Sequence, residues 1–431
     1  MSSLKADRVR AEIQKVAPIL VLGRRKESVL EAIAWPREVE ERFFACNAER
    51  LPEVEYNVDK DGLGKQIQSL SAVAKKVEGA DIVSEWLRNT VEGQIGACRL
   101  LLSMGTAQFS VCSRELYGSA ASRFYQGQAT NLDFAEHLLE RLTILGWDEA
   151  KDPEEKPMSA PQFVSELQER INRRRPKLAV ETMLDARCSA KAIAGMRKVR
   201  VRPDATFRSW EADALYYHEV ETHSLTAHNG AAQPELSFLC TGGPRTTLTQ
   251  EGLAVFSELY NRVLGIDRIE RLAIRVKLCA MAENGATFLD LYRFLLARGS
   301  SKRDAYFDAQ RICRGGLVTG GAPFTKDACY LAGLLHVYAF LSVFVRGGFR
   351  DEMELVVCGR LALDDIAALA ELRSLGILTR PKHRPRWLRS WNTLLPYFAF
   401  SSFLDSVNLG PVEDHYRDVL EVAKRASPTA S

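Results

Sequence analysis

The motif HEVETH, residues 218–223, constrains the local fold more than any other part of the chain, because it sets two histidines five residues apart. Five residues at about 100° each would separate these side chains by about 140° around a regular α-helix. A helix that aims both imidazoles at one point must therefore be widened between them, as in a π-bulge, a feature often found at functional sites. We predict such a widened helix between His218 and His223.

The residue types of this motif are those of a catalytic zinc site. Such a site takes three protein ligands from histidines and carboxylates, keeps one position for water, and needs a nearby base. In this interpretation His218 and His223 are two ligands and Glu219 is the base. The alternative is a polar helix end with cap or core histidines. His228 has the spacing of a third ligand, and equally that of a helix-end histidine that interacts with the last carbonyls.

A distant glutamate is the better candidate for the third ligand. Glu251, in TQEGLAV, begins a predicted amphipathic helix that would pack against the histidine helix. Seven residues on, Glu258 lies on the same face, where it would hydrogen-bond a ligand histidine. The alternatives are a favourable interaction of Glu251 with the helix dipole and a solvated Glu258.

Two further stretches are candidates for substrate contacts. Arg311 and Arg314, in RICRGG, stand one turn apart, and arginine forks suit carboxylates such as a peptide C-terminus. They are equally typical of helix C-terminal cations followed by a glycine stop. The alternating run KVRVRP, 198–203, predicts a strand, which either binds extended substrate at a sheet edge or lies buried within the sheet.

The pattern along the chain predicts a mostly helical α+β protein with a small sheet. Apolar residues recur at helical spacing through a helical N-terminal region, 1–150. Charge, Pro and Ser without periodicity mark a linker at 151–161, and the catalytic domain then covers 162–431. Within that domain, KLAVE at 177–181 predicts another strand, and helices follow for most of the remaining chain.

The longest apolar run, 331–345, is shorter than the roughly 20 residues that a membrane helix needs and contains His336. We therefore expect a buried core helix and no membrane span. Lys and Arg total 58 against 55 Asp and Glu, a balance that does not indicate a nucleic-acid surface.

The cysteines and the N-terminus predict a cytoplasmic protein. The nine cysteines are scattered without a CxxC pair, which suggests neither a disulfide framework nor a thiolate zinc site. The N-terminus has no signal-peptide pattern, so we expect no export.

Several separated motifs together resemble a known family. They occur in the order and approximate spacing of the bacterial QEGLA-motif proteins, which are similar to the microtubule-associated tyrosine carboxypeptidases that act on tubulin tails. The resemblance extends from about residue 101 to 388. It is carried by HEVETHSLTAHNGAAQPELSFL, TQEGLAVFSELY, RLAIRV, RICRGG and PFTKDACYLAGLL.

The resemblance implies one Zn²⁺ per chain, with His218, His223 and Glu251 as ligands and Glu219 as general base and acid. The dipeptidyl-peptidase III enzymes are similar in combining HExxxH with a distant Glu. Asn229, Gln233 and Pro234 match the turn that follows the zinc helix in the family, and Asn229 is a candidate substrate contact. Arg311, Arg314 and Lys326 match the basic positions of the family near the expected cleft.

The predicted function is a zinc-dependent peptidase of carboxypeptidase type, acting on a peptide or protein C-terminus. Tyr330, His228 and the basic residues are candidates for the oxyanion donor, and Tyr330 also for substrate binding. Glu221, where the family more often has Gly, adds a charge that would suit an aminopeptidase. The rival functions are a non-catalytic or regulatory zinc protein that binds peptide C-termini, and a metal-free helical scaffold.

Overall fold

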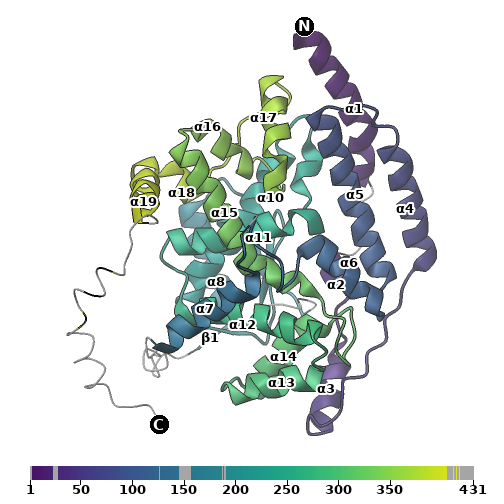
Figure 1. Cartoon of the computed structure of the whole chain (residues 1–431), viewed down its shortest axis with the longest axis vertical. Coiled ribbons are helices and arrows are strands. Elements are labelled where there is room, and N and C mark those ends of the chain that lie inside the picture. Colours follow the sequence, from purple (N-terminus) through teal and green to yellow (C-terminus); the bar gives the residue numbers. More distant parts are fainter. Residues whose placement is uncertain are drawn as a thin grey trace.

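A computed structural model describes residues 2–22, 28–125, 127–144, 157–186, 188, 191–404, 411, 414 and 417. Within these residues the protein is mostly helical and has a small sheet, so the predicted α+β class is confirmed (Figure 1). The predicted linker at 151–161 lies mainly outside the described residues. The helices before it are α1 (Ser2–Leu22), α2 (Val29–Ala32), α3 (Arg37–Ala45), α4 (Lys60–Ala74), α5 (Ile82–Leu102), α6 (Ala107–Tyr117) and α7 (Asn131–Ile144).

The second part of the chain begins with the strands and ends in helices. Its first elements are β1 (Met158–Ser159), α8 (Ala160–Arg174), β2 (Glu181–Leu184), β3 (Ala192–Ala194), β4 (Lys198–Val201), β5 (Thr206–Phe207) and α9 (Glu211–Leu215). Next come the π-helix η2 (Tyr216–Ser224), α10 (Leu225–Ala231), η3 (Ser237–Cys240), α11 (Pro244–Tyr260), α12 (Ile266–Glu283), α13 (Phe288–Ala297) and α14 (Lys302–Cys313). The last are η4 (Thr325–Ala328), α15 (Cys329–Arg346), α16 (Arg350–Met353), η5 (Glu354–Val357), η6 (Leu363–Asp365), α17 (Ile366–Ser374), α18 (Arg386–Arg389) and α19 (Trp391–Leu404).

The strand predicted at 198–203 is β4, and it is the central strand of a three-stranded sheet with the order β2-β4-β3. It pairs in parallel with β2 and antiparallel with β3. Val199 and Val201 are fully buried, so the buried alternative holds and β4 offers no free edge to a substrate. The strand predicted at 177–181 begins only at Glu181, as β2.

The helix that carries the two histidines is widened as predicted. It begins as the α-helix α9, continues as the π-helix η2 over Tyr216–Ser224, and returns to α-helical geometry in α10. The side chain of Thr222 donates to the carbonyl of Tyr217, five residues back, at 3.0 Å. A hydroxyl thus supplements the backbone hydrogen bonds of the widened turn.

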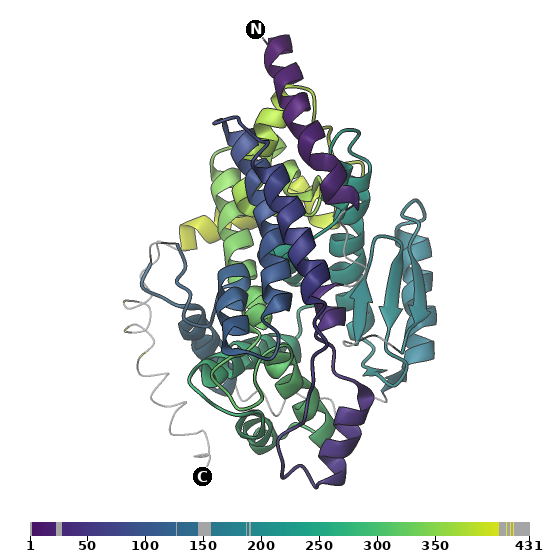
Figure 2. The same cartoon turned by 90° about the vertical axis from the view of Figure 1, so that its right-hand side faces the viewer.

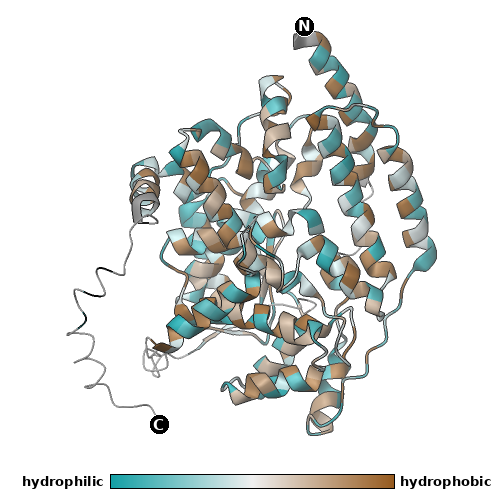
Figure 3. Ribbon diagram, viewed as in Figure 1, coloured by the Kyte–Doolittle hydropathy of each residue, from teal (hydrophilic) through white to brown (hydrophobic). Residues whose placement is uncertain are grey.

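The N-terminal helices share one hydrophobic core with the rest of the described chain. Val9 and Ile13 of α1 and Trp86 of α5 belong to the same buried cluster as Val199 of β4 and Phe256 of α11. Figure 2 shows α1 and α5 lying against the body of the molecule, with the sheet beside them. Both hydrophobic and hydrophilic residues occur on the outer helices, as expected of helices with one buried face (Figure 3).

Helices α11 and α15 cross with their backbones in contact at Gly252 and Gly333. A Cβ atom added to Gly252 would lie 2.2 Å from the carbonyl oxygen of Gly333, and one added to Gly333 would lie 2.3 Å from the carbonyl oxygen of Leu248. Only glycine permits this approach of the two backbones. The approach fixes the position of Glu251, the neighbour of Gly252, relative to α15. The prediction that Glu251 begins this helix is wrong. Helix α11 begins at Pro244, so Glu251 lies inside it.

The apolar run predicted as a core helix is α15. Its residues Leu331, Leu334, Val337 and Leu341 are buried. By length and composition alone, the helical segment Thr325–Arg346 would suffice to cross a membrane, and 61% of its apolar window is buried inside the structure. Packing against α11 accounts for that burial.

We expect Gly252→Ala to lower the free energy of unfolding by about 3 kcal/mol, because the added methyl group collides with rigid backbone. Gly64→Ala is the control: it lies inside α4 with nothing within 4 Å of an added Cβ, so it should leave stability unchanged or raise it by up to about 1 kcal/mol. Urea unfolding followed by circular dichroism measures both. Equal stabilities for the two variants would contradict the proposed close crossing.

Candidate metal centre and cleft

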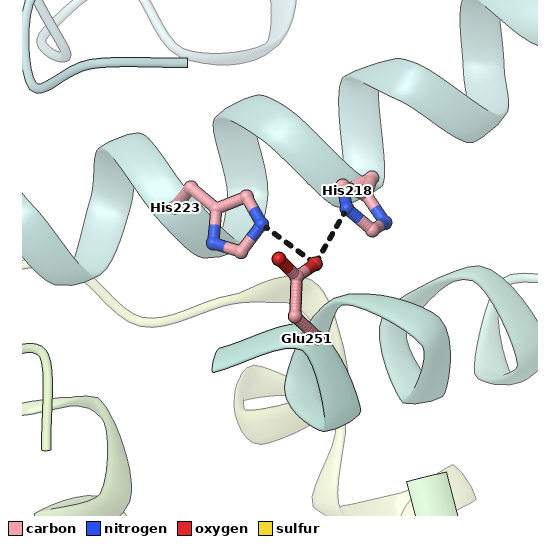
Figure 4. Close-up of side chains that lie close together, drawn as sticks. All are labelled: His218, His223 and Glu251. Atoms are coloured by element: carbon pink, nitrogen blue, oxygen red, sulfur yellow. Dashed lines mark ion pairs between the residues drawn. The ribbon is translucent and has the colours of Figure 1, made fainter. Parts of the chain in front are cut away.

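Three side chains from two helices converge on one point. Nε2 of His218 lies 3.4 Å and Nε2 of His223 lies 3.6 Å from Oε2 of Glu251. The ligand atoms of all three residues lie within 4.8 Å of one another. Figure 4 shows the two imidazoles descending from η2 toward the same carboxylate oxygen on α11. Two histidines and a carboxylate form a ligand set that suits zinc.

The convergence depends on the π-helix. In a regular helix the two histidines would point about 140° apart, whereas here their ring centroids lie 5.0 Å apart and their planes are nearly perpendicular. One extra residue in the turn rotates His223 onto the face of His218. The five-residue spacing is therefore compatible with binding of one metal ion by both histidines.

Glu258 holds His218 from behind. Its Oε1 lies 2.6 Å from Nδ1 of His218, and it also accepts hydrogen bonds from Arg268 at 3.2 and 3.3 Å. Burial would raise the pKa of Glu258, but Arg268 and His218 together outweigh burial and lower that pKa. An ionised Glu258 orients the imidazole so that Nε2 faces Glu251, which is the usual outer support of a metal-binding histidine.

The charges of the cluster leave a place for a cation. Lys326 donates to Oε1 of Glu251 at 2.8 Å. Burial would raise the pKa of Glu251, but Lys326, His218 and His223 together outweigh burial and hold that pKa well below its ordinary value. Oε2 of Glu251 is buried and has no hydrogen-bond partner among the described residues. Burial opposes charge on His218, but Glu251 and Glu258 outweigh it and raise its pKa to about 10. A buried acceptor facing two imidazole nitrogens is the chemistry that a divalent metal satisfies.

Glu219 lies beside this cluster in the same cleft. Its Oε2 accepts a hydrogen bond from the backbone N–H of Ala194 at 2.9 Å, which ties η2 to the end of strand β3. The side chain is 7% exposed and lines the cleft with both histidines. Glu219 directly follows His218, so it lies next to the cluster. It is not one of the three residues that converge.

The cleft has a volume of about 500 Å³ and contains most of the residues that the sequence singled out for substrate contacts. Arg311, Arg314, Lys326 and Tyr330 all line it. The ring of Tyr330 lies parallel to that of His218, with centroids 6.4 Å apart.

Two of the cleft cations are already neutralised by protein carboxylates. Arg311 makes a two-pronged ion pair with Asp327 at 2.7 and 2.8 Å. Lys326 pairs with Glu251, one of the three converging residues. Arg314 is buried, and both its burial and the charge of Arg311 lower its pKa to about 10. Arg314 lines the same cleft as the two histidines.

Asn229 and His228 do not line the cleft. The amide of Asn229 is fully buried, donates to the carbonyls of Val357 and His383 at 2.7 Å each, and accepts from the N–H of His383 at 2.8 Å. Its hydrogen-bonding groups connect the end of η5 to the segment around His383, which leaves none for a substrate. His228 packs its ring against His383, with centroids 6.1 Å apart. Burial lowers the pKa of His228.

Glu221 does not line the cleft that contains His218, His223 and Glu251. Its carboxylate accepts two hydrogen bonds from Arg175, at 2.6 and 2.5 Å, and one each from the hydroxyl of Tyr216 and the N–H of Arg386. A carboxylate satisfied in this way is not available to a substrate amine. The one sequence feature that favoured an aminopeptidase is therefore a structural anchor of η2.

Two features of the cleft escaped the sequence analysis. Arg360 lines the cleft and donates from Nη2 to the carbonyl of His223 at 3.2 Å, but it stands in no recognised motif. The second feature is the contribution of the first forty residues, the N-terminal segment, from which Leu20, Val29 and Leu30 line the same cleft. Neither followed from sequence spacing, since both lie more than 100 residues from the histidines along the chain.

A buried His-His-Glu cluster in a cleft, with another glutamate beside it, defines a candidate metal centre in a mostly helical protein. A comparison with protein families matches residues 41–406 to the microtubule-associated tyrosine carboxypeptidases. The chain belongs to this family of carboxypeptidases. Comparison with curated proteins gives no match.

We expect Arg175→Met to lower the free energy of unfolding by about 3 kcal/mol or more, because it leaves the charge of buried Glu221 without its partner. Arg37→Met is the control, since Arg37 and Glu41 form an exposed pair whose loss should cost less than about 1 kcal/mol. Thermal and urea unfolding measure both variants. A loss at Arg175 no larger than that at Arg37 would show that Glu221 is not held in this way.

Proposed function

We propose that the protein is a zinc-dependent carboxypeptidase that hydrolyses a peptide bond near a peptide or protein C-terminus. One observation carries the proposal: Nε2 of His218, Nε2 of His223 and Oε2 of Glu251 converge in a cleft, with Glu219 beside them. Membership of a carboxypeptidase family supports the reaction class. A C-terminal tyrosine, which the family name specifies, is the first substrate to test.

In this proposal His218, His223 and Glu251 hold the zinc. Bound zinc would supply Lewis acidity, polarising the scissile carbonyl and making water more acidic. Glu258 keeps His218 aligned through Nδ1, and Lys326 holds the other oxygen of Glu251, so that both ligands enter the site already oriented.

Glu219 is the proposed general base and acid. It takes a proton from the attacking water and returns it to the nitrogen of the leaving group. The hydrogen bond from Ala194 fixes its Oε2 and thereby limits rotation of the carboxylate. Both proton transfers require one carboxylate near the scissile bond, and Glu219 lies in the cleft next to His218.

The cleft cations supply the proposed grip on the substrate C-terminus. Because Arg311 and Lys326 are paired with Asp327 and Glu251, we assign the terminal carboxylate chiefly to Arg360, which lines the same cleft. Burial lowers the pKa of Arg360, so an anion placed beside it would restore favourable interactions that burial removed.

Strand β3 is the proposed site of the substrate backbone. It is an edge strand of the sheet, and Ala192, Ile193 and Ala194 all line the cleft. An extended peptide could add to this edge beside the metal centre. The assignment replaces the strand at 198–203, which is central.

The second candidate is a non-catalytic zinc protein that binds peptide C-termini in the same cleft. The same ligands and cations support it, and it differs only in needing no proton transfer by Glu219. We also propose a cytoplasmic location, because none of the nine cysteines, all of which lie among the described residues, forms a disulfide.

Metal analysis with turnover distinguishes these functions. We expect one zinc per wild-type chain, loss of zinc in His223→Ala and Glu251→Ala, and retention of zinc in Glu219→Gln with at least about 100-fold slower hydrolysis, because only proton transfer is removed. Elemental analysis and a C-terminal peptide assay measure these values. Full zinc with no hydrolysis by the wild type would favour the binding protein, and absence of zinc after reconstitution would exclude both.

Arg360→Met should lower kcat/KM for peptides with a free C-terminal carboxylate by about 10- to 100-fold, the value of a hydrogen bond to a charged group. Hydrolysis of the corresponding C-terminal amides should change much less. Arg380→Met is the control, because Arg380 is an exposed partner of Asp351 outside the cleft. Zinc content is measured in each variant, and equal losses for acids and amides would argue against carboxylate binding by Arg360.

A further inference from the structure

The N-terminal segment of the chain forms part of the catalytic cleft although it lies outside the family match. The match begins at residue 41, whereas Ile19, Leu20, Val29, Leu30 and Glu31 line the same 500 Å³ cleft as the two histidines. The first forty residues therefore contribute walls that the matched part of the chain does not provide.

Short helix α2 is anchored to two different parts of the fold. On one side Val29 and Ile33 are buried in a cluster with Leu100 of α5 and Phe109 of α6. On the other, Oε1 of Glu31 accepts a hydrogen bond from Arg200 of strand β4 at 3.1 Å. Figure 2 shows the N-terminal segment lying between the long helices and the sheet.

The local sequence explains why α2 keeps this position. Ser28 accepts a hydrogen bond from the N–H of Glu31, and Glu31 accepts one from the N–H of Ser28, forming a capping box. The backbone hydrogen bond from Ser28 is the main cause of the lowered pKa of Glu31, with Arg200 adding to it. Glu31 therefore stays ionised and paired, and the apolar side chains of the segment face the cleft without a competing free charge.

The cleft thus has two chemically different sides. Arg314 and Arg360 provide positive charge, whereas Ile19, Leu20 and Leu30 of the N-terminal segment provide an apolar surface. Leu30 is only partly buried, so part of its side chain remains available for contact. An apolar substrate side chain would be desolvated favourably there, whereas a charged one would lose hydration without gaining a partner.

We propose that Leu20 and Leu30 are specificity-determining residues, which form an apolar wall of the cleft against a substrate side chain near the C-terminus. This inference rests on the proposed peptidase function and assigns part of the selectivity to a segment outside the family match. Leu30 is the better residue to alter, because Leu20 is almost fully buried and its replacement would also disturb the core.

The test measures peptide binding in the zinc-loaded Glu219→Gln protein, where hydrolysis does not interfere. Two peptides that differ only in the side chain near the C-terminus, one leucine and one alanine, are titrated by calorimetry. Leu30→Trp should occupy the space in the cleft next to residue 30. It should therefore weaken binding of the leucine peptide by about 10-fold or more relative to the alanine peptide. Leu30→Ala should reduce the preference of the parent for leucine over alanine.

Leu4→Ala provides the control, because Leu4 lies on α1 with 78% of its surface exposed and does not line the cleft. It should leave both affinities unchanged, and thermal unfolding checks that each variant is folded. If the ratio of the affinities for the leucine and alanine peptides is unchanged in both folded Leu30 variants, the proposed role of Leu30 in specificity is wrong, and the peptidase proposal is unaffected. Failure of the parent protein to bind either peptide would instead overturn the substrate site and the wall together.

Discussion

The widened turn of η2 is the constraint on which the site depends. It brings two imidazoles from one helix onto one carboxylate, and it does so only because neighbouring groups support the turn. Glu221 is bound by Arg175 on the side away from the cleft, and Thr222 bonds to the carbonyl five residues back. Support from both sides explains how an uncommon helical geometry persists over nine residues.

The position of the third converging residue is set by a separate device. Glycines on α11 and α15 let the two backbones touch, and Glu251 is the neighbour of one of them. Lys326, which precedes α15 in η4, then reaches the same carboxylate. The QEG sequence is thus explained by packing as well as by chemistry, because a larger residue at position 252 would move Glu251 relative to η2.

Much of this arrangement could be predicted from local spacing. The five-residue interval between histidines predicts the π-helix, and the seven-residue interval from Glu251 to Glu258 puts both carboxylates on the face toward His218. Spacing did not reveal which cations are paired. Arg311 is neutralised by Asp327, sixteen residues later, through tertiary contacts that no motif encodes. Alternation also identified β4 as a strand but could not distinguish the centre of a sheet from its edge, because neighbours determine that difference.

The π-helix also relates this motif to the shorter HExxH spacing by a single insertion. Four residues turn a regular α-helix through about 400°, which leaves two histidines only about 40° apart, so HExxH needs no widening. Here the fifth residue is absorbed within Tyr216–Ser224, and the helix resumes its ordinary geometry in α10. The two spacings can therefore present the same pair of imidazoles, and a pattern search that requires four-residue periodicity will overlook chains in which one residue has been accommodated in this way.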